Sequence, residues 1–146
     1  MTLGLYMNHP QVALAYDLAR HFHDGQKYGD GPYINHPIRV AARIDDPLLQ
    51  AAALLHDTLE DTEATDAGLI GSGVNPGVVE IVRILTRDEE GEDYKDYIER
   101  IIESGSQYAM KIKLSDLLDN LSQWPPERLR ARYLNALVRI SKALTL

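Results

Sequence analysis

The stretch at residues 51–63 reads AAALLHDTLEDTE, and it decides the fold class. It begins as one of the most apolar runs in the chain, and a run of alanine and leucine is typical of a buried helix. It then places one imidazole and three carboxylates within six residues: His56, Asp57, Glu60 and Asp61. Burying unpaired carboxylates together is unfavourable unless a cation lies among them. The stretch therefore predicts a buried helix that ends at a cation site.

Apolar residues recur at helical spacing elsewhere in the chain, and no window shows the alternation of a β-strand. The pairs Asp46-Pro47 and Asn75-Pro76 each combine a capping residue with a proline suited to the first helical turn. The segment 24–35, DGQKYGDGPYIN, holds three glycines and a proline and is predicted as a loop. The predicted helices cover residues 8–23, 36–44, 46–57, 76–85, 92–103, 107–121 and 126–144. The pattern predicts an all-α, single compact domain.

Composition narrows the possible functions. The chain has 146 residues, 45% of them hydrophobic and 25% charged, which suits one globular domain. The formal net charge of −7 argues against a nucleic-acid surface, because phosphate backbones require clustered Lys and Arg. No cysteine is present, so disulfides and thiolate metal sites are excluded. No apolar run reaches the roughly 18–20 residues of a membrane span, and no secretion signal begins the chain. We therefore expect a soluble, cytoplasmic protein.

On a continuous helix the polar residues of the opening stretch would share one side. His56 lies four residues before Glu60, and Asp57 lies four before Asp61. Residues four apart are neighbours on a helix surface, so all four fall within about 140° of arc. Glu60, one turn beyond His56, could then act on a water molecule as a base.

A second predicted helix carries a matching polar stripe. Lys113, Asp116 and Asn120 have the spacing i, i+3, i+7 and share one face among apolar neighbours. A divalent metal between two such helices would offset the buried acids, and imidazole and carboxylate groups suit Mn²⁺, Fe²⁺ or Zn²⁺. Because the adjacent His56 and Asp57 cannot complete a coordination sphere alone, further ligands must come from elsewhere. Asp116 and His36 are the candidates.

Three segments together resemble a known family: HDGQKYGDGPYINHPIRVA (23–41), AAALLHDTLEDT (51–62) and KIKLSDLLDNL (111–121). The order His, His-Asp, Asp on a helical chain resembles the HD-domain metal-dependent phosphohydrolases. The segments look like those of the alarmone hydrolases, which are the (p)ppGpp 3′-pyrophosphohydrolase domains of the Rel/SpoT type and their small stand-alone relatives. The resemblance implies one HD-domain bundle of about seven or eight helices over residues 1–146.

The resemblance also implies roles for particular residues. One divalent ion, usually Mn²⁺ in this family, would be held by four ligands: His36, His56, Asp57 and Asp116. Glu60 and Asp61 match the pair that works beside the metal on the attacking water. Asn120 matches a residue that holds the ribose, and Lys113 would be a cation behind the ligands or beside a phosphate.

The loop at 24–35 departs from the family pattern. In the alarmone hydrolases this loop carries an arginine-rich pair that packs on the guanine base, whereas Lys27 and Tyr28 stand here. A tyrosine can stack on a base, and a lysine can meet a phosphate. We therefore expect both residues to contact a small nucleotide substrate.

Three functions follow as hypotheses. The first is metal-dependent hydrolysis of the 3′-diphosphate of an alarmone such as (p)ppGpp, with release of pyrophosphate. The second is an HD-family nucleotidase or phosphodiesterase that acts on another nucleotide, which the altered loop leaves open. The third is a binding module that kept the fold and lost turnover, against which the complete ligand set and the pair Glu60-Asp61 argue.

Overall fold

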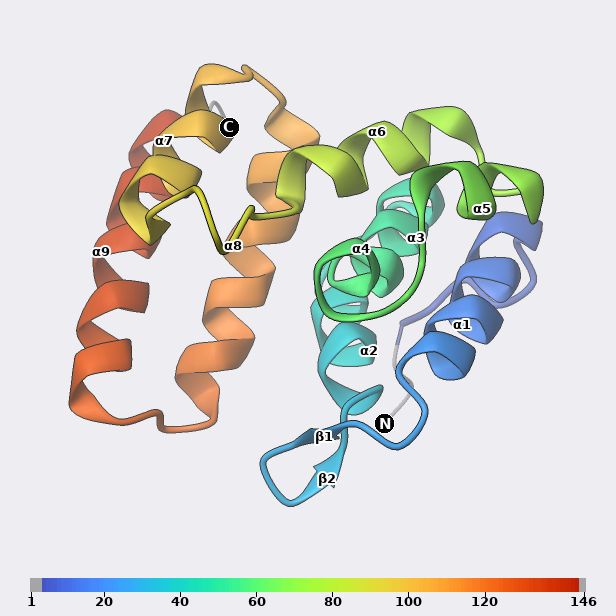
Figure 1. The fold of residues 1–146 in the computed structure, drawn as a ribbon, viewed down its shortest axis with the longest axis horizontal. Helices are drawn as coiled ribbons and strands as arrows, with labels where there is room; N and C mark the ends of the chain where they lie inside the picture. The colour runs from blue at the N-terminus through green and yellow to red at the C-terminus, as the bar shows by residue number, and fades with distance from the viewer. Residues whose placement is uncertain (1–3, 145–146) are drawn as a thin grey trace.

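The computed structural model describes residues 4–144, and this part of the chain is a bundle of helices (Figure 1). Within it lie eight helices of six residues or more and one four-residue turn of helix. Their bounds are α1 Pro10–Phe22, α2 Asn35–Ala42, α3 Pro47–Leu55, α4 Thr58–Asp61, α5 Asp66–Gly71, α6 Pro76–Leu85, α7 Tyr94–Glu103, α8 Gln107–Ser122 and α9 Glu127–Ala143. The predicted all-α class is confirmed. The sequence did not predict α4 and α5, because such short helices show no period.

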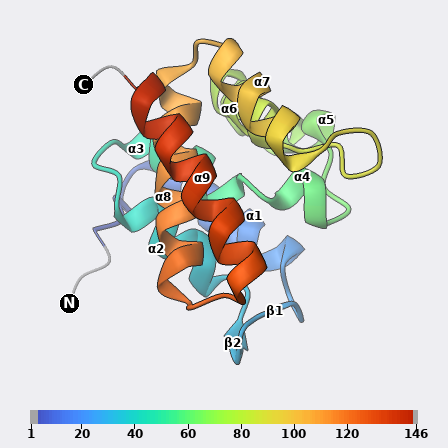
Figure 2. The same cartoon turned by 90° about the vertical axis from the view of Figure 1, so that its left-hand side faces the viewer.

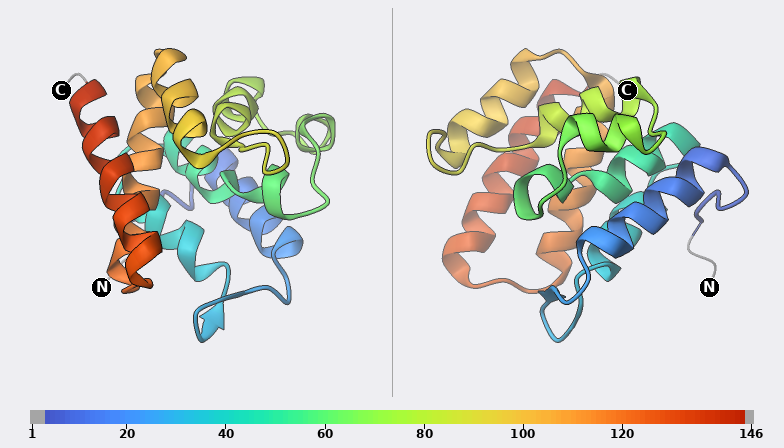
Figure 3. Two further views of the ribbon diagram at one scale, coloured as in Figure 1. Left: turned by 60° about the vertical axis from the view of Figure 1, so that its left-hand side comes forward. Right: turned by 45° about the vertical axis from the view of Figure 1, so that its right-hand side comes forward.

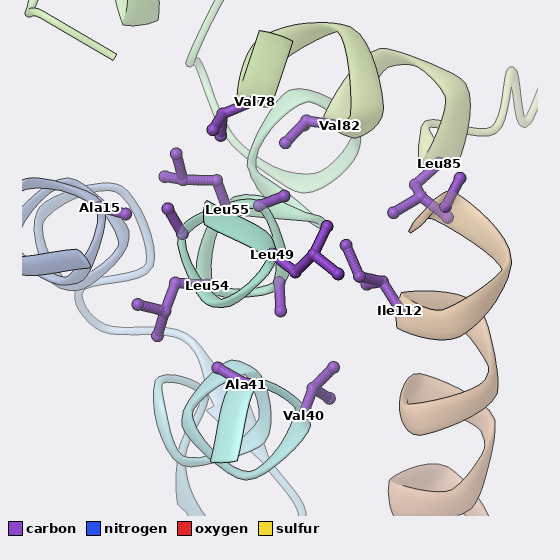
Figure 4. Packing of buried hydrophobic residues seen from close by; sticks show 14 of the residues in the cluster. Ala15, Val40, Ala41, Leu49, Leu54, Leu55, Val78, Val82, Leu85 and Ile112 are labelled. Carbon is purple, nitrogen blue, oxygen red and sulfur yellow. The ribbon is translucent and has the colours of Figure 1, made fainter. Parts of the chain in front are cut away.

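Helix α3 is the centre of the bundle. It packs against α1, α2, α6 and α8, which surround it in Figure 4. Leu54 and Leu55 have no exposed surface, and neither do the alanines Ala51–Ala53 between them and the helix start. Burying one leucine side chain contributes about 1.5–3 kcal/mol. The small alanines allow neighbouring helices to approach closely, so the most apolar stretch becomes the core of the domain.

The two predicted helix starts are confirmed. The Asp46 carboxylate accepts a hydrogen bond from the Leu49 N–H at 3.0 Å, and the Asn75 side chain accepts one from the Gly77 N–H at 2.7 Å. Each cap is followed by a proline at the first helical position. Such a cap satisfies an N–H group that has no partner inside the helix.

The prediction of one continuous helix through Asp57 is wrong. Helix α3 ends at Leu55, and α4 begins at Thr58. Side chains bind carbonyl oxygens of the last turn. His56 Nδ1 lies 2.6 Å from the Ala53 oxygen, and the Thr58 hydroxyl donates to the Leu55 oxygen at 2.8 Å. Such local side-chain bonds compete with the helical ladder and interrupt it here.

The segment predicted as a loop contains a small hairpin, which projects from the bundle in each view of Figures 1 and 3. Strand β1 (Lys27–Tyr28) pairs antiparallel with β2 (Gly31–Pro32). Gly29 in the turn has φ of +62°, which a glycine adopts without strain. Strands of only two residues cannot show alternation, so the sequence pattern could not reveal them.

The C-terminal helices form the other side of the molecule. Helices α8 and α9 lie side by side, and α7 packs against α9 (Figures 1 and 2). Helix α8 also contacts α2 and α3 and so joins the two sides. Across residues 4–144, each helix is too short or too polar to cross a membrane.

Candidate metal centre and active site

Three of the predicted metal ligands converge from three parts of the fold. His36 lies in the first turn of α2, His56 follows α3, and Asp116 lies in α8. The Asp116 Oδ1 atom is 2.9 Å from His36 Nε2 and 3.4 Å from His56 Nε2. The three side chains are buried and present their donor atoms within 4.8 Å of one another. They form a group that could hold a metal ion.

Asp57 completes the predicted set. Its Oδ2 atom is 3.1 Å from His56 Nε2 and 3.6 Å from His36 Nε2. The Tyr33 hydroxyl donates a hydrogen bond to the same oxygen. The interruption after α3 therefore leaves Asp57 beside both imidazoles, although it does not lie on a continuous helix.

The hydrogen bonds of the two imidazoles fit a metal. His56 Nδ1 faces the Ala53 carbonyl, which only accepts, so the proton is on Nδ1 and the Nε2 lone pair faces the cluster. His36 Nδ1 lies 2.7 Å from Asp119 Oδ2, which favours the same tautomer. Among residues 4–144, His56 Nε2 is a buried nitrogen without a hydrogen bond. A divalent cation would supply the partner that this atom lacks.

The cluster attracts positive charge. Burial lowers the pKa of His36, but its hydrogen bonds with Asp116 and Asp119 raise that pKa above the usual value overall. Lys113 Nζ lies 2.7 Å from Asp116 Oδ2. Burial also opposes the charge of Lys113, yet Asp116 holds its pKa well above the usual range. Lys113 thus contacts a candidate ligand and also lines the adjoining cavity, so both of its predicted roles stay predictions.

Glu60 and Asp61 lie beside the cluster on α4, and both line its cavity. Burial raises the pKa of Glu60 to about 7, the backbone N–H of Arg87 opposes this, and the charges of Asp57 and Asp61 add to it. Burial and then Asp57 raise the pKa of Asp61 to about 6. A carboxyl with a pKa near neutrality is suited to accept a proton from water.

The structure places some of the residues predicted to contact substrate at the metal-site cavity and one of them outside it. Tyr28 and Asn120 line the cavity of about 230 Å³, and the Tyr28 hydroxyl donates to Asn120 Oδ1 at 2.6 Å. The Tyr28 ring stacks on the His36 ring, with centroids 4.5 Å apart, so one face is covered. Lys27 is exposed on the hairpin and does not line this cavity. Asn120 Nδ2 also donates to Asp116 Oδ1 at 3.3 Å, so the predicted α8 stripe is one connected set.

Sequence reasoning missed Asp119. Its carboxylate is fully buried and accepts hydrogen bonds from Arg39 Nε at 2.7 Å and Arg43 Nη1 at 3.2 Å, besides its contact with His36. An acid three residues after Asp116 on an apolar helix was the available signal. The two arginines balance its charge and connect α2 to α8 at the metal centre.

Comparisons with known proteins place the chain among named relatives. It is 36% identical over 131 residues to a guanosine-3′,5′-bis(diphosphate) 3′-pyrophosphohydrolase of Aquifex aeolicus, covering 82% of this chain and 18% of that protein. It is 39% identical over 124 residues to the guanosine-3′,5′-bis(diphosphate) 3′-pyrophosphohydrolase MESH1 of Mus musculus, covering 76% of this chain and 68% of that protein. No family model matches the chain. The chain spans about a fifth of the length of bacterial relatives such as the Aquifex protein.

A solved structure supports the same relationship. It is described as a metazoan orthologue of SpoT that hydrolyses ppGpp, and it superposes with a TM-score of 0.75 at 28% identity. The match covers 92% of this chain and 85% of that one, so nearly the whole helical arrangement is shared. The chain belongs to the Rel/SpoT-type family of guanosine-3′,5′-bis(diphosphate) 3′-pyrophosphohydrolases.

Proposed function

We propose that the chain hydrolyses the 3′-diphosphate of a purine alarmone, (p)ppGpp or a close relative, and releases pyrophosphate. The observation that carries the proposal is the convergence of His36, His56 and Asp116, with Asp57 beside them, at the edge of a cavity that Glu60 lines. Relatives named for this reaction support it. The proposal includes the cytoplasmic location and the single-domain organisation over residues 1–146 that the sequence predicts.

We assign the ion-binding role to His36, His56, Asp57 and Asp116, with Mn²⁺ as the expected ion. The donor set supports this, because two neutral imidazoles and two carboxylates suit Mn²⁺ as well as Fe²⁺ or Zn²⁺. When bound, the ion would offset phosphate charge and lower the pKa of water.

The chain's own residues do the rest of the chemistry. Glu60, with Asp61 beside it, takes a proton from the attacking water as the water oxygen bonds to the phosphorus on ribose O3′. The bond from that phosphorus to O3′ breaks, pyrophosphate leaves, and a proton on O3′ completes the nucleotide product. Asn120 faces the ribose, and Lys113 holds Asp116 in place through their 2.7 Å contact.

One observation favours the second candidate, a nucleotidase or phosphodiesterase acting on another nucleotide. The Tyr28 ring is partly covered by His36, and Lys27 does not line the cavity. The hairpin therefore offers less to a purine base than the sequence suggested. This weakens base recognition and leaves the metal chemistry intact.

Turnover of the Mn²⁺-loaded protein tests the proposal. The substrates are ppGpp, pppGpp, ppApp and common mononucleotides, with the products identified by chromatography. We expect pyrophosphate and guanosine 5′-diphosphate from ppGpp, and little discrimination between guanine and adenine. Hydrolysis of a mononucleotide or phosphodiester, with no pyrophosphate from any alarmone, would transfer the assignment to the second candidate.

A further inference from the structure

The metal-site cavity is too small for a whole alarmone. Its volume is about 230 Å³, whereas pockets that enclose ligands of this size are about 300–1,000 Å³. Part of a nucleotide that carries two diphosphate groups must therefore extend beyond it. The structure contains a second, larger groove at one end of this cavity.

That groove lies between α7 and α9 and has a volume of about 710 Å³. It shares three lining residues with the metal-site cavity, namely Arg87, Tyr94 and Arg132, so the two spaces adjoin. The elements that form it, α7 and α9, pack against each other (Figure 2). A ligand that leaves the metal site in this direction passes the guanidinium groups of Arg87 and Arg132, which line both spaces.

Neither of these guanidinium groups forms an ion pair with a carboxylate of the described residues. Arg132 is exposed, and among residues 4–144 its side chain makes no ion pair or hydrogen bond; its guanidinium carbon lies 4.8 Å from the Tyr94 ring centroid. The Arg87 guanidinium carbon lies 5.6 Å from the same centroid, and within the described part of the chain the side chain donates only to the Glu92 carbonyl. By contrast, Arg139 in the same groove is paired with Glu99 at 2.5 Å.

The Tyr94 hydroxyl adds an unused polar group at the junction. It is buried and has no hydrogen-bond partner within the described residues. The junction therefore brings together two guanidinium groups without an ion pair and a hydroxyl without a hydrogen bond, as the described residues show. Arginine and phosphate form strong charge-assisted hydrogen bonds, and buried hydroxyls are normally satisfied.

We propose that Arg87 and Arg132, which both lie near the Tyr94 ring at the junction, form a phosphate-binding subsite. The inference rests on the proposed function and deepens it. The subsite takes a phosphate group of the nucleotide that the metal ligands do not hold. Two groups have this chemistry: the distal phosphate of the 3′-diphosphate, which leaves in pyrophosphate, and the 5′-diphosphate.

Calorimetric titration of the Mn²⁺-loaded protein with inorganic pyrophosphate and with guanosine 5′-diphosphate distinguishes the two sources. Arg132→Gln removes the charge from an exposed side chain, and the matched control is Arg128→Gln, one turn earlier on α9 and lining neither cavity. Metal content is measured before and after each titration. We expect Arg132→Gln to weaken at least one ligand about 10-fold and Arg128→Gln to stay within about twofold of the wild type.

Weaker binding of pyrophosphate assigns the subsite to the distal phosphate, and weaker binding of guanosine 5′-diphosphate assigns it to the 5′-diphosphate. If Arg132→Gln weakens neither ligand, or if Arg128→Gln weakens both equally, the subsite is wrong. The proposed function fails on a different result, the absence of pyrophosphate release from ppGpp by the wild type. Binding that depends on Arg132 can persist in that case, so the two failures are distinguishable.

Discussion

Asp119 lies outside the proposed ligand set but determines the orientation and tautomer of one proposed ligand, His36. Its contact with His36 Nδ1 directs the Nε2 lone pair into the cluster, while Arg39 and Arg43 neutralise the buried carboxylate. Partners of this kind orient metal-ligating imidazoles and raise their basicity. Asp119 is therefore a positioning residue.

Asp119→Asn should weaken metal binding by about 10–100-fold, because the neutral amide no longer polarises the imidazole. Competition with a chromophoric chelator measures the affinity, and circular dichroism verifies the fold. The control is Asp96→Asn, an exposed acid on α7. Unchanged affinity in Asp119→Asn would show that the carboxylate only connects helices.

Glu60→Gln should lower kcat by at least about 10²-fold and retain the metal, because it removes the proposed base without removing a ligand. The pKa of Glu60 is raised to about 7. A base must be deprotonated, so wild-type kcat should fall as the pH decreases through about 7. The variant should lose this dependence. Steady-state rates and metal analysis measure both, and an unchanged rate would mean that another group prepares the water.

At the scale of the element, the interruption between α3 and α4 decides the shape of the site. The Thr58 hydroxyl is bonded to the Leu55 carbonyl, three residues earlier, and Thr58 is fully buried. This contact helps to end α3 where Asp57 faces both imidazoles. A similar contact ends α7, where the Ser104 hydroxyl donates to the Ile101 carbonyl at 2.6 Å.

Thr58→Val keeps the side-chain shape and removes that hydrogen bond. The free energy of unfolding should therefore fall by about 0.5–1.5 kcal/mol, and by more if the buried Leu55 carbonyl is left without a partner. Activity should fall at least about 10-fold, since small displacements of catalytic groups are costly. Ser104→Ala is the matched control and should reduce stability alone. Urea unfolding and steady-state rates measure the two effects. Equal activity in both variants would show that the hydrogen bond at the helix interruption is not needed for catalysis.

At the scale of the whole molecule, the proposed ion connects distant parts of the chain. His36 and Asp116 are 80 positions apart, and His56 joins them from the end of the central helix. An ion that binds only the folded arrangement stabilises it by mass action.

Mn²⁺ at about a hundred times Kd should add about 2.7 kcal/mol to the free energy of unfolding. Each kcal/mol shifts Tm by about 2–4 °C for a chain of this size, so Tm should rise by roughly 5–10 °C. Differential scanning calorimetry with and without chelator measures the shift. The variant His56→Ala should show no shift. A shift that persists there would point to the other acidic group, Glu60, Asp61 and Glu89.

The sequence by itself determined the features that depend on residues close together along the chain. Apolar spacing predicted the long helices, and Asp46-Pro47 and Asn75-Pro76 predicted two of their starts. The i, i+3, i+7 spacing placed Lys113, Asp116 and Asn120 on one face, where contacts now join them. These relations follow from the geometry of a single helix, which local sequence encodes directly.

Only the tertiary structure decided the relations between distant elements. It paired His36 with Asp119 across 83 residues, and it placed Arg132 of α9 beside the cavity of α2 and α8. Spacing along one helix carries no information about which side chains meet after packing, since those contacts depend on how whole helices are placed against each other.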